Sequence, residues 1–274
     1  MSVNPELRRL EIDIPAQPEA LVKLSLLLAD EDINLAAAAE LIEADMALAA
    51  AVMKAVNSSL YGLKGRVQSV MQAITYLGMR EVAAITFEMG LRAAFPPAQE
   101  LEPLWQRAAL RGLLMGRVAQ KLSLDSWAAH SAGLFEECGK AVLFRHAPDH
   151  YRAMLRAAGS DLELVQLEHA GFGVSHDALG AALCESWGLA APAVASVRHH
   201  VAVQAEGLLP TSLAPARRTL TALSAIVRAL MAEPARLEDV VLALAPQADL
   251  DATLVLRAMR QIKEQLDEAV AHGR

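Results

Sequence analysis

Two segments decide the fold: DMALAAAVMKAVNSSLYG (residues 45–62) and VQSVMQAITYLGMREV (residues 67–82). Each contains a polar residue, Asp45 at the start of the first and Ser69 near the start of the second, that can accept the free backbone N–H groups at the start of a helix. A run of alanine and larger apolar residues follows in both. In the first segment the apolar run ends at Asn57, which opens a polar turn. The pattern predicts two helices joined by a sharp reversal.

Apolar residues spaced three and four apart extend this prediction along the rest of the chain. The predicted helices cover residues 18–29, 34–43, 45–56, 69–77, 79–95, 101–122, 126–145, 149–158, 161–170, 176–187 and 191–201, and a final set runs from Pro215 to the C-terminus. Two adjacent prolines, Pro96 and Pro97, predict a break at residues 95–100 between two helical halves. No sustained alternation of apolar and polar residues indicates strands. The expected fold is therefore all-α, a multi-helix bundle in two packed halves with a C-terminal helical extension.

The composition supports this fold class and argues against one class of partner. The 274 residues are 54% hydrophobic but only 4% aromatic, which suits helices that pack closely through alanine and leucine. The formal net charge is −7, and basic residues do not cluster. The densest basic spot, Arg217-Arg218, is interpreted as a solvated helix face. Direct binding to nucleic acid is therefore not expected.

Cysteine usage and apolar run length predict the cellular compartment. Cys138 and Cys184 stand apart without paired spacing, as small buried residues do in a reduced protein. Apolar runs are interrupted by charge or proline before the roughly 18 residues that a membrane span needs. We expect a cytoplasmic, bacterial protein that does not associate with membranes.

In combination, the two opening segments resemble the HDOD family. Members share an Asn-Ser-x-x-Tyr-Gly turn and an Ala-Ile-x-x-Leu-Gly element, matched here by residues 57–62 and 73–78. The resemblance continues, in the family's order, through LWQRAALRG (104–112), GLFEECGKAVLFRHAPDHY (133–151), EHAGFGVSHDALGAALCESWGL (168–189) and VASVRHHV (194–201). It implies an all-α bundle related to HD-domain phosphohydrolases. We expect an HDOD-like domain over residues 14–207 and a C-terminal helical segment, 208–274, packed on it.

The same resemblance implies a degenerate metal site. HD phosphohydrolases hold metal ions with His and Asp side chains from several helices. Arg107 stands where the enzymes place a His after a Trp, and Glu136-Glu137 stand at the defining His-Asp pair. The Asp expected on a later helix has no counterpart in TLTALSAIV, residues 219–227. Because Arg107 is a permanent cation, we expect it to pair with Glu136 or Glu137 rather than to bind metal.

Three histidines of the ancestral pattern remain, His176, His199 and His200. A structural role is the favoured interpretation for each, and His199 and His200 cannot point the same way on a helix. The alternative is a residual metal site in which these histidines join Glu136 or Glu137. We predict no catalytic residue, no cofactor and no tightly held metal.

Asn57 is the first candidate for contact with a ligand at the polar turn, although hydrogen bonding to the backbone is the favoured reading. The leading functional prediction is a noncatalytic signal-transduction module that binds a signalling protein in trans. A metal-dependent phosphohydrolase or phosphodiesterase acting on a nucleotide or cyclic dinucleotide is the first alternative. A small-molecule sensor that uses a cleft between the two halves is the second. The input signal and the oligomeric state stay open.

Overall fold

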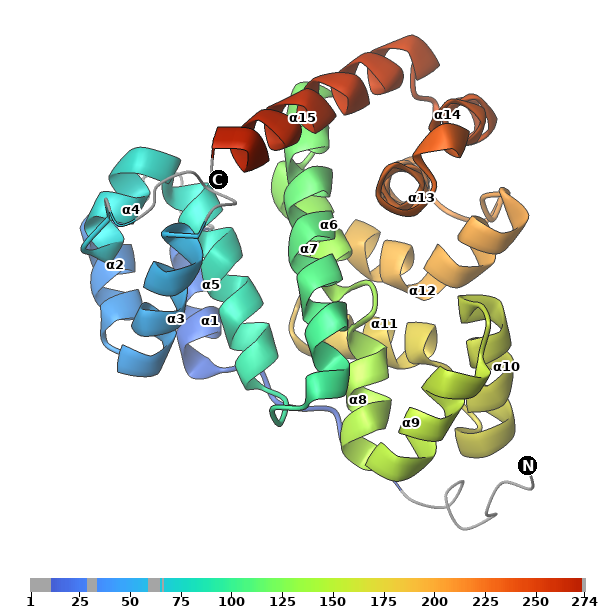
Figure 1. The fold of residues 1–274 in the computed structure, drawn as a ribbon, viewed down its shortest axis with the longest axis horizontal. Coiled ribbons are helices and arrows are strands. Elements are labelled where there is room, and N and C mark those ends of the chain that lie inside the picture. Colours follow the sequence, from blue (N-terminus) through green and yellow to red (C-terminus); the bar gives the residue numbers. More distant parts are fainter. Residues whose placement is uncertain (1–10, 29–33, 59–64, 66, 273–274) are drawn as a thin grey trace. The chain divides into compact units, whose positions relative to one another are not determined.

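The regular structure is helical throughout the described part of the chain. The structure is a computed structural model that describes residues 11–28, 34–58, 65 and 67–272 (Figure 1). Within these ranges every α-helix is joined to the next by a turn, a loop or a short 3-10 helix, and no strand occurs. The predicted all-α fold is confirmed.

The chain divides into two compact units. The smaller unit takes the described residues of 16–94 and 260–274, and the larger takes those of 1–15 and 95–259. One of the three boundaries falls between Ala94 and Phe95, directly before the two prolines that predicted a break.

The smaller unit is built from the two segments that open the resemblance, together with the helices around them. Its elements are α1 (Glu19–Leu28), α2 (Leu35–Glu43), α3 (Met46–Val56), α4 (Val70–Leu77), α5 (Met79–Ala93) and the end of α15 (Ala252–His272). Asp45 and Ser69 accept backbone N–H groups at the starts of α3 and α4, as predicted. Gly78 then separates α4 from α5 with a φ of 87°, which L side chains rarely adopt.

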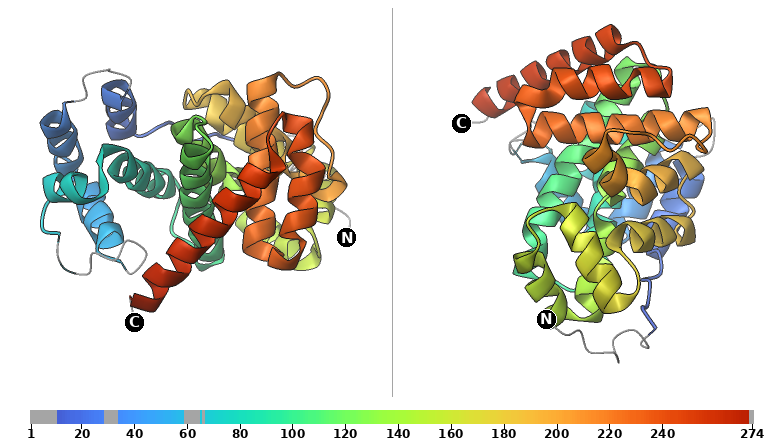
Figure 2. Two further views of the ribbon diagram at one scale, coloured as in Figure 1. Left: turned by 90° about the horizontal axis from the view of Figure 1, so that it is seen from above. Right: turned by 90° about the vertical axis from the view of Figure 1, so that its right-hand side faces the viewer.

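The larger unit holds the remaining helices. They are α6 (Glu102–Lys121), α7 (Ser126–Phe135), α8 (Cys138–His146), α9 (Pro148–Ala157), α10 (Asp161–Phe172), α11 (His176–Ser186), α12 (Ala191–Glu206), α13 (Pro215–Ala232), α14 (Leu237–Leu244) and the start of α15. Helix α12 crosses α13 and packs against it, and α6 packs along α7 (Figures 1 and 2). Large side chains such as Tyr151, Phe135 and Met115 are fully buried in its core.

Two helices differ from the sequence prediction by more than two residues. The single helix predicted over residues 126–145 is wrong, because α7 ends at Phe135 and α8 begins at Cys138. The break places two acidic side chains in the interior, and no glycine or proline at residues 136–137 announces it in the sequence. Helix α12 runs five residues beyond the predicted end at Val201 and stops at Gly207, whose φ is 68°.

Candidate functional site

The break between α7 and α8 turns Glu136 and Glu137 into the interior of the larger unit. Their relative exposures are 1% and 4%, so water contributes little to the solvation of either carboxylate. A buried charge is tolerated when other charges and hydrogen bonds compensate it. The partners of these two carboxylates therefore define the site.

Glu137 accepts hydrogen bonds from three cationic side chains. Arg107 binds it with two nitrogens, Nε to Oε2 and Nη2 to Oε1, both at 3.1 Å. Arg111 Nη2 donates to Oε2 at 2.7 Å, and Lys140 Nζ donates to Oε1 at 2.7 Å. The ion pair that the sequence predicted for Arg107 is confirmed. Two contacts on each oxygen use the roughly four lone-pair positions of a carboxylate, which leaves no open coordination position.

Glu136 is held mainly by neutral partners. Ser224 Oγ donates to Oε2, and Gln204 Nε2 donates to Oε1 at 3.1 Å. Arg111 Nε lies 3.3 Å from Oε1, within ion-pair reach but not aligned as a hydrogen bond. Ser224 belongs to the segment in which the resemblance expected an aspartate and found none.

Asp161, the first residue of α10, supplies a third carboxylate. Lys140 Nζ donates to its Oδ1 at 2.7 Å, and Arg228 Nη1 donates to its Oδ2 at 2.8 Å. The same Arg228 nitrogen also donates to Gln204 Oε1 at 2.9 Å.

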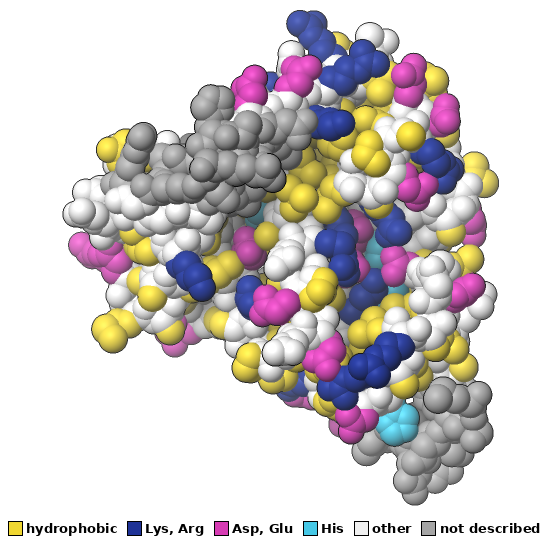
Figure 3. Space-filling model, viewed as in Figure 1, with side chains coloured by type: hydrophobic (Ala, Val, Ile, Leu, Met, Phe, Trp, Pro, Cys, Tyr) yellow, Lys and Arg dark blue, Asp and Glu magenta, His cyan; other side chains and the backbone are white. Residues whose placement is uncertain are grey.

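These contacts close into a ring of seven side chains, which we call the polar ring. Each member contacts the next in the order Arg111, Glu137, Lys140, Asp161, Arg228, Gln204, Glu136 and back to Arg111. The members come from α6, the α7–α8 break, α8, α10, α12 and α13, so the ring ties distant parts of the larger unit together. Figure 3 shows basic, acidic and histidine side chains gathered in a hollow on this unit, to the right of α6 and α7.

The electrostatics of the ring favour the charged forms of Glu137 and Lys140. Burial opposes ionisation of Glu137, but the charges of Lys140 and Arg111 hold the pKa of that carboxyl well below its usual range. Burial likewise opposes protonation of Lys140, whereas Glu137 and Asp161 raise the pKa of its ammonium above the ordinary value. Each charge is thus stabilised by its neighbours rather than by water.

The retained histidines lie beside the polar ring with one ring nitrogen anchored. His176 is fully buried, and its Nδ1 lies 2.8 Å from Glu168 Oε2, an arrangement in which Nδ1–H donates to the carboxylate. Tyr151 donates to the other oxygen of Glu168 at 2.5 Å. His200 is also buried, with Nδ1 2.7 Å from the carbonyl oxygen of Val197.

The two buried imidazoles face each other with ring centroids 5.4 Å apart. Neither His176 Nε2 nor His200 Nε2 has a hydrogen-bond partner among the described residues. Burial lowers the pKa of His200, so this imidazole is neutral near pH 7. His199 is only half-buried, in keeping with the expectation that the two neighbouring histidines point in different directions.

The two carboxylates at the predicted metal-site positions are bound by protein donors. Glu137 is saturated by protein donors, and Glu136 is held by Ser224 and Gln204. Within the described ranges no group of three or more His, Cys, Asp or Glu side chains is placed to hold a metal ion. Of the alternative ligand set Glu136, Glu137, His176, His199 and His200, the Nε2 atoms of His176 and His200 are buried without a hydrogen-bond partner among the described residues.

Asn57 has a structural role in the part of its turn that is described. Its Nδ2 donates to the carbonyl oxygens of Met53 and Val67, at 3.0 and 2.9 Å, and its Oδ1 accepts from the backbone N–H of Val67. The side chain thereby joins the two ends of the turn. Residues 59–64 and 66, where a ligand contact was considered, lie outside the described residues.

Sequence reasoning missed most members of the polar ring. Two carried a local signal, because Arg111 lies four residues after Arg107 on the same helix face and Lys140 lies three residues after Glu137. The others, Asp161, Gln204 and Arg228, come from helices distant in sequence, and only the fold brings them to the site.

The pKa shifts at the site predict how stability depends on pH. Because the pKa of Glu137 is lowered in the folded state, its contribution is present above the unfolded value and lost as the pH falls below about 4.5. The pKa of His200 is also lowered in the folded state. Its contribution to stability is therefore lost as the pH falls below about 6.5, because the unfolded chain then binds more protons than the folded chain. The pKa of Lys140 is raised in the folded state, so its contribution to stability is lost only as the pH rises above about 10.5.

Urea unfolding across the pH range tests this expectation. Comparing wild type with a His200→Gln variant isolates this imidazole from other groups that titrate in the same range, such as Glu88, whose pKa burial raises to about 7, and His199, whose pKa burial lowers. Between pH 7 and pH 5 the free energy of unfolding of the wild type should fall relative to that of the variant. A constant difference between the two proteins over this range would contradict the assignment.

In the described ranges, no helix is both long enough and apolar enough to cross a membrane.

Solved structures resemble the whole chain. An HDOD domain protein of unknown function from Geobacter sulfurreducens has a TM-score of 0.71 at 18% identity, covering 96% of this chain and 94% of that one. A proposed phosphohydrolase from Shewanella amazonensis SB2B has a TM-score of 0.69 at 17% identity, covering 98% and 97%. At these identities the likeness shows the fold alone.

A curated relative and a family model place the sequence. An uncharacterized protein of Treponema pallidum (strain Nichols) is 26% identical over 192 residues, which cover 69% of this chain but 37% of the relative. The chain thus spans little more than a third of that relative's length. The model of the HDOD domain matches residues 14–203. The chain therefore belongs to the HDOD domain family, as its opening segments and its helical architecture indicated.

Proposed function

We propose that this protein is a noncatalytic regulatory module that acts by binding another protein. The observation that carries the proposal is the saturation of Glu137 by Arg107, Arg111 and Lys140. In a metal-dependent phosphohydrolase, carboxylates at such a centre bind cations that also contact the substrate and the attacking water. Here the positive charge belongs to the protein itself, so the carboxylates are committed to structure.

The partner class follows from charge. The net charge of −7 and the scattered basic residues disfavour a polyanionic partner, which leaves a protein as the partner of choice. One solved structure of similar fold, from Marinobacter aquaeolei VT8, is a proposed signal transduction protein that is 23% identical. We propose the same broad role for this chain, in the bacterial cytoplasm, with a signalling partner in trans. Residues 208–274 are proposed to form a C-terminal segment beside an HDOD domain of residues 14–207.

The alternative is a metal-dependent phosphohydrolase with a rebuilt site. The observation in its favour is the pair of buried imidazoles, whose Nδ1 atoms are anchored and whose Nε2 atoms are unpartnered within the described structure. Such anchoring is common where the other nitrogen binds a metal. Two nitrogens are, however, fewer ligands than hydrolytic metal sites use.

Elemental analysis and a turnover assay separate the two functions. We expect the purified wild type to hold far less than one metal ion per chain. We also expect it to hydrolyse bis(4-nitrophenyl) phosphate in Mn²⁺ no faster than a His176→Gln, His200→Gln double variant does. Stoichiometric metal together with turnover that is lost in the double variant would replace the regulatory proposal with the enzyme.

A pull-down from extract of the native host tests the positive half of the proposal. The wild type should retain a signalling protein, and the His176→Gln, His200→Gln variant should retain it equally, because neither buried imidazole is available to a partner. Capture that requires these histidines or added metal would argue against a role independent of the degenerate centre.

A further inference from the structure

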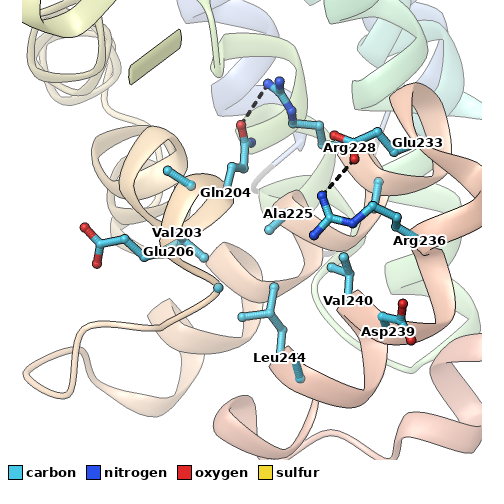
Figure 4. Close-up of a pocket in the computed structure, with 14 residues that line it drawn as sticks. Val203, Gln204, Glu206, Ala225, Arg228, Glu233, Arg236, Asp239, Val240 and Leu244 are labelled. Carbon is cyan, nitrogen blue, oxygen red and sulfur yellow. Dashed lines mark hydrogen bonds and ion pairs between the residues drawn. The ribbon is translucent and has the colours of Figure 1, made fainter. Parts of the chain in front are cut away.

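A pocket lies between the C-terminal end of α12 and helices α13 and α14 (Figure 4). Its volume is about 300 Å³, at the lower end of the range for small-molecule sites. Its apolar lining comes from Val203, Ala225, Ala229, Val240 and Leu244. The family match ends at residue 203, so most of the pocket is built by the C-terminal helices rather than by the family domain.

Two guanidinium groups also line this pocket. Arg228 is 35% exposed at its side chain, and both hydrogen bonds that it makes within the described structure run through Nη1. Its Nε and Nη2 are therefore available as donors. Its carboxylate partner, Asp161, is shared with Lys140, so Arg228 holds only part of a counter-charge.

The second guanidinium belongs to Arg236, at the junction of α13 and α14. Its Nη1 donates to Glu233 Oε2 at 2.9 Å, an exposed ion pair that a stronger partner can displace at little cost. Figure 4 shows the Arg236 head group beside Ala225, inside the ring of lining residues. Of the other acidic lining residues, Glu206 lies at the far left of the same view and Asp239 lies beside Val240.

We propose that this pocket binds a small organic anion, with a carboxylate head between Arg228 and Arg236 and an apolar body over Ala225, Val240 and Leu244. Charge-assisted hydrogen bonds from two guanidinium groups would fix the head, and burial of the body would add apolar contact. The inference does not depend on the regulatory function proposed above, because none of its residues supports that argument.

The position of Arg228 gives the pocket a route to the centre of the unit. Arg228 donates a hydrogen bond to Gln204, and Gln204 donates one to Glu136. An anion that accepts a hydrogen bond from Arg228 therefore contacts a member of the polar ring. Members of a hydrogen-bonded chain polarise one another. Bound anion should therefore stabilise the folded state as well as fill the pocket.

Three probes with the same six-carbon chain test the chemistry: hexanoate, hexylamine and 1-hexanol. Dissociation constants come from saturation-transfer NMR with the full chain. Hexanoate should bind at least about tenfold more tightly than either other probe, the difference that one charge-assisted hydrogen bond supplies. Equal binding of all three, or tighter binding of hexylamine, would overturn the proposal.

Variants at exposed positions locate the binding site without disturbing the core. Arg236→Gln should weaken hexanoate binding about tenfold, and Ala243→Phe, at an exposed lining position, should fill the pocket and abolish it. Arg217→Gln, at an exposed arginine of α13 outside the pocket, should leave the affinity unchanged. Hexanoate binding that survives both pocket variants would show that the anion binds elsewhere and would defeat the assignment.

Discussion

Replacing Glu137 with Gln should destabilise the protein by about 3–5 kcal/mol, the usual cost of removing one partner from a buried ion pair. The amide keeps the size of the carboxyl group but loses its charge. The variant leaves three cations, Arg107, Arg111 and Lys140, without the carboxylate that they share. Two of them, Arg111 and Lys140, are no more than 5% exposed, so water cannot replace the lost charge. The amide NH₂ group also faces donors where the carboxylate offered only acceptors.

Urea unfolding of wild type and variant at pH 7 measures this loss. Glu185→Gln removes the same charge from an exposed position on α11 and should change stability by no more than about 0.5 kcal/mol. In the double variant Glu137→Gln, Lys140→Met, removal of one uncompensated cation should recover part of the loss. A Glu137→Gln variant as stable as the Glu185→Gln control would show that the four contacts on this carboxylate contribute nothing.

The ionic part of the site could be predicted only where a motif placed the residues. The family pattern predicts that Arg107 pairs with Glu136 or Glu137, and in the structure its partner is Glu137. Asp161 and Arg228 complete the charge balance, but they lie on α10 and α13 and meet only when six segments of the chain have packed. Their positions in the sequence therefore do not predict that contact.

Helix starts were predicted well because their signals are local. Asn34, Asp45, Ser69 and Ser160 each accept a backbone N–H from the first turn of the helix that they open. The break between α7 and α8 has no glycine or proline that would signal it in the sequence. Glu136 keeps helical dihedrals, with φ −49° and ψ −46°, whereas Glu137 leaves them, with φ −101° and ψ 6°. The carboxylate of Glu137 contacts Arg107 and Arg111 of α6, and no local propensity encodes those contacts.

Gly139 is another residue whose role depends on a contact with a distant segment, the backbone of α11. Gly139 is the second residue of α8, where alanine would ordinarily favour the helix by about 0.5–1 kcal/mol. A Cβ atom there, however, would lie 1.9 Å from the carbonyl oxygen of His176 and 2.7 Å from the backbone nitrogen of Gly180. Both atoms belong to the backbone of α11, so no side-chain rotation can relieve the overlap. Helices α8 and α11 would have to move apart.

Gly139→Ala should therefore destabilise the protein by about 3 kcal/mol or more, because overpacking against backbone outweighs the gain in helix propensity. In thermal unfolding this corresponds to a drop in Tm of roughly 6–12 °C for a unit of this size. Gly159→Ala is the matched control, since its Cβ would meet only the flexible end of Glu163 at 3.1 Å, and its Tm should stay within about 2 °C of the wild type. Because the clash falls on the carbonyl group of His176, the variant should also displace that imidazole from Glu168, which the NMR shift of its Nδ1 proton reports. A Gly139→Ala protein that matches the control in both measurements would mean that α8 and α11 do not meet through this glycine.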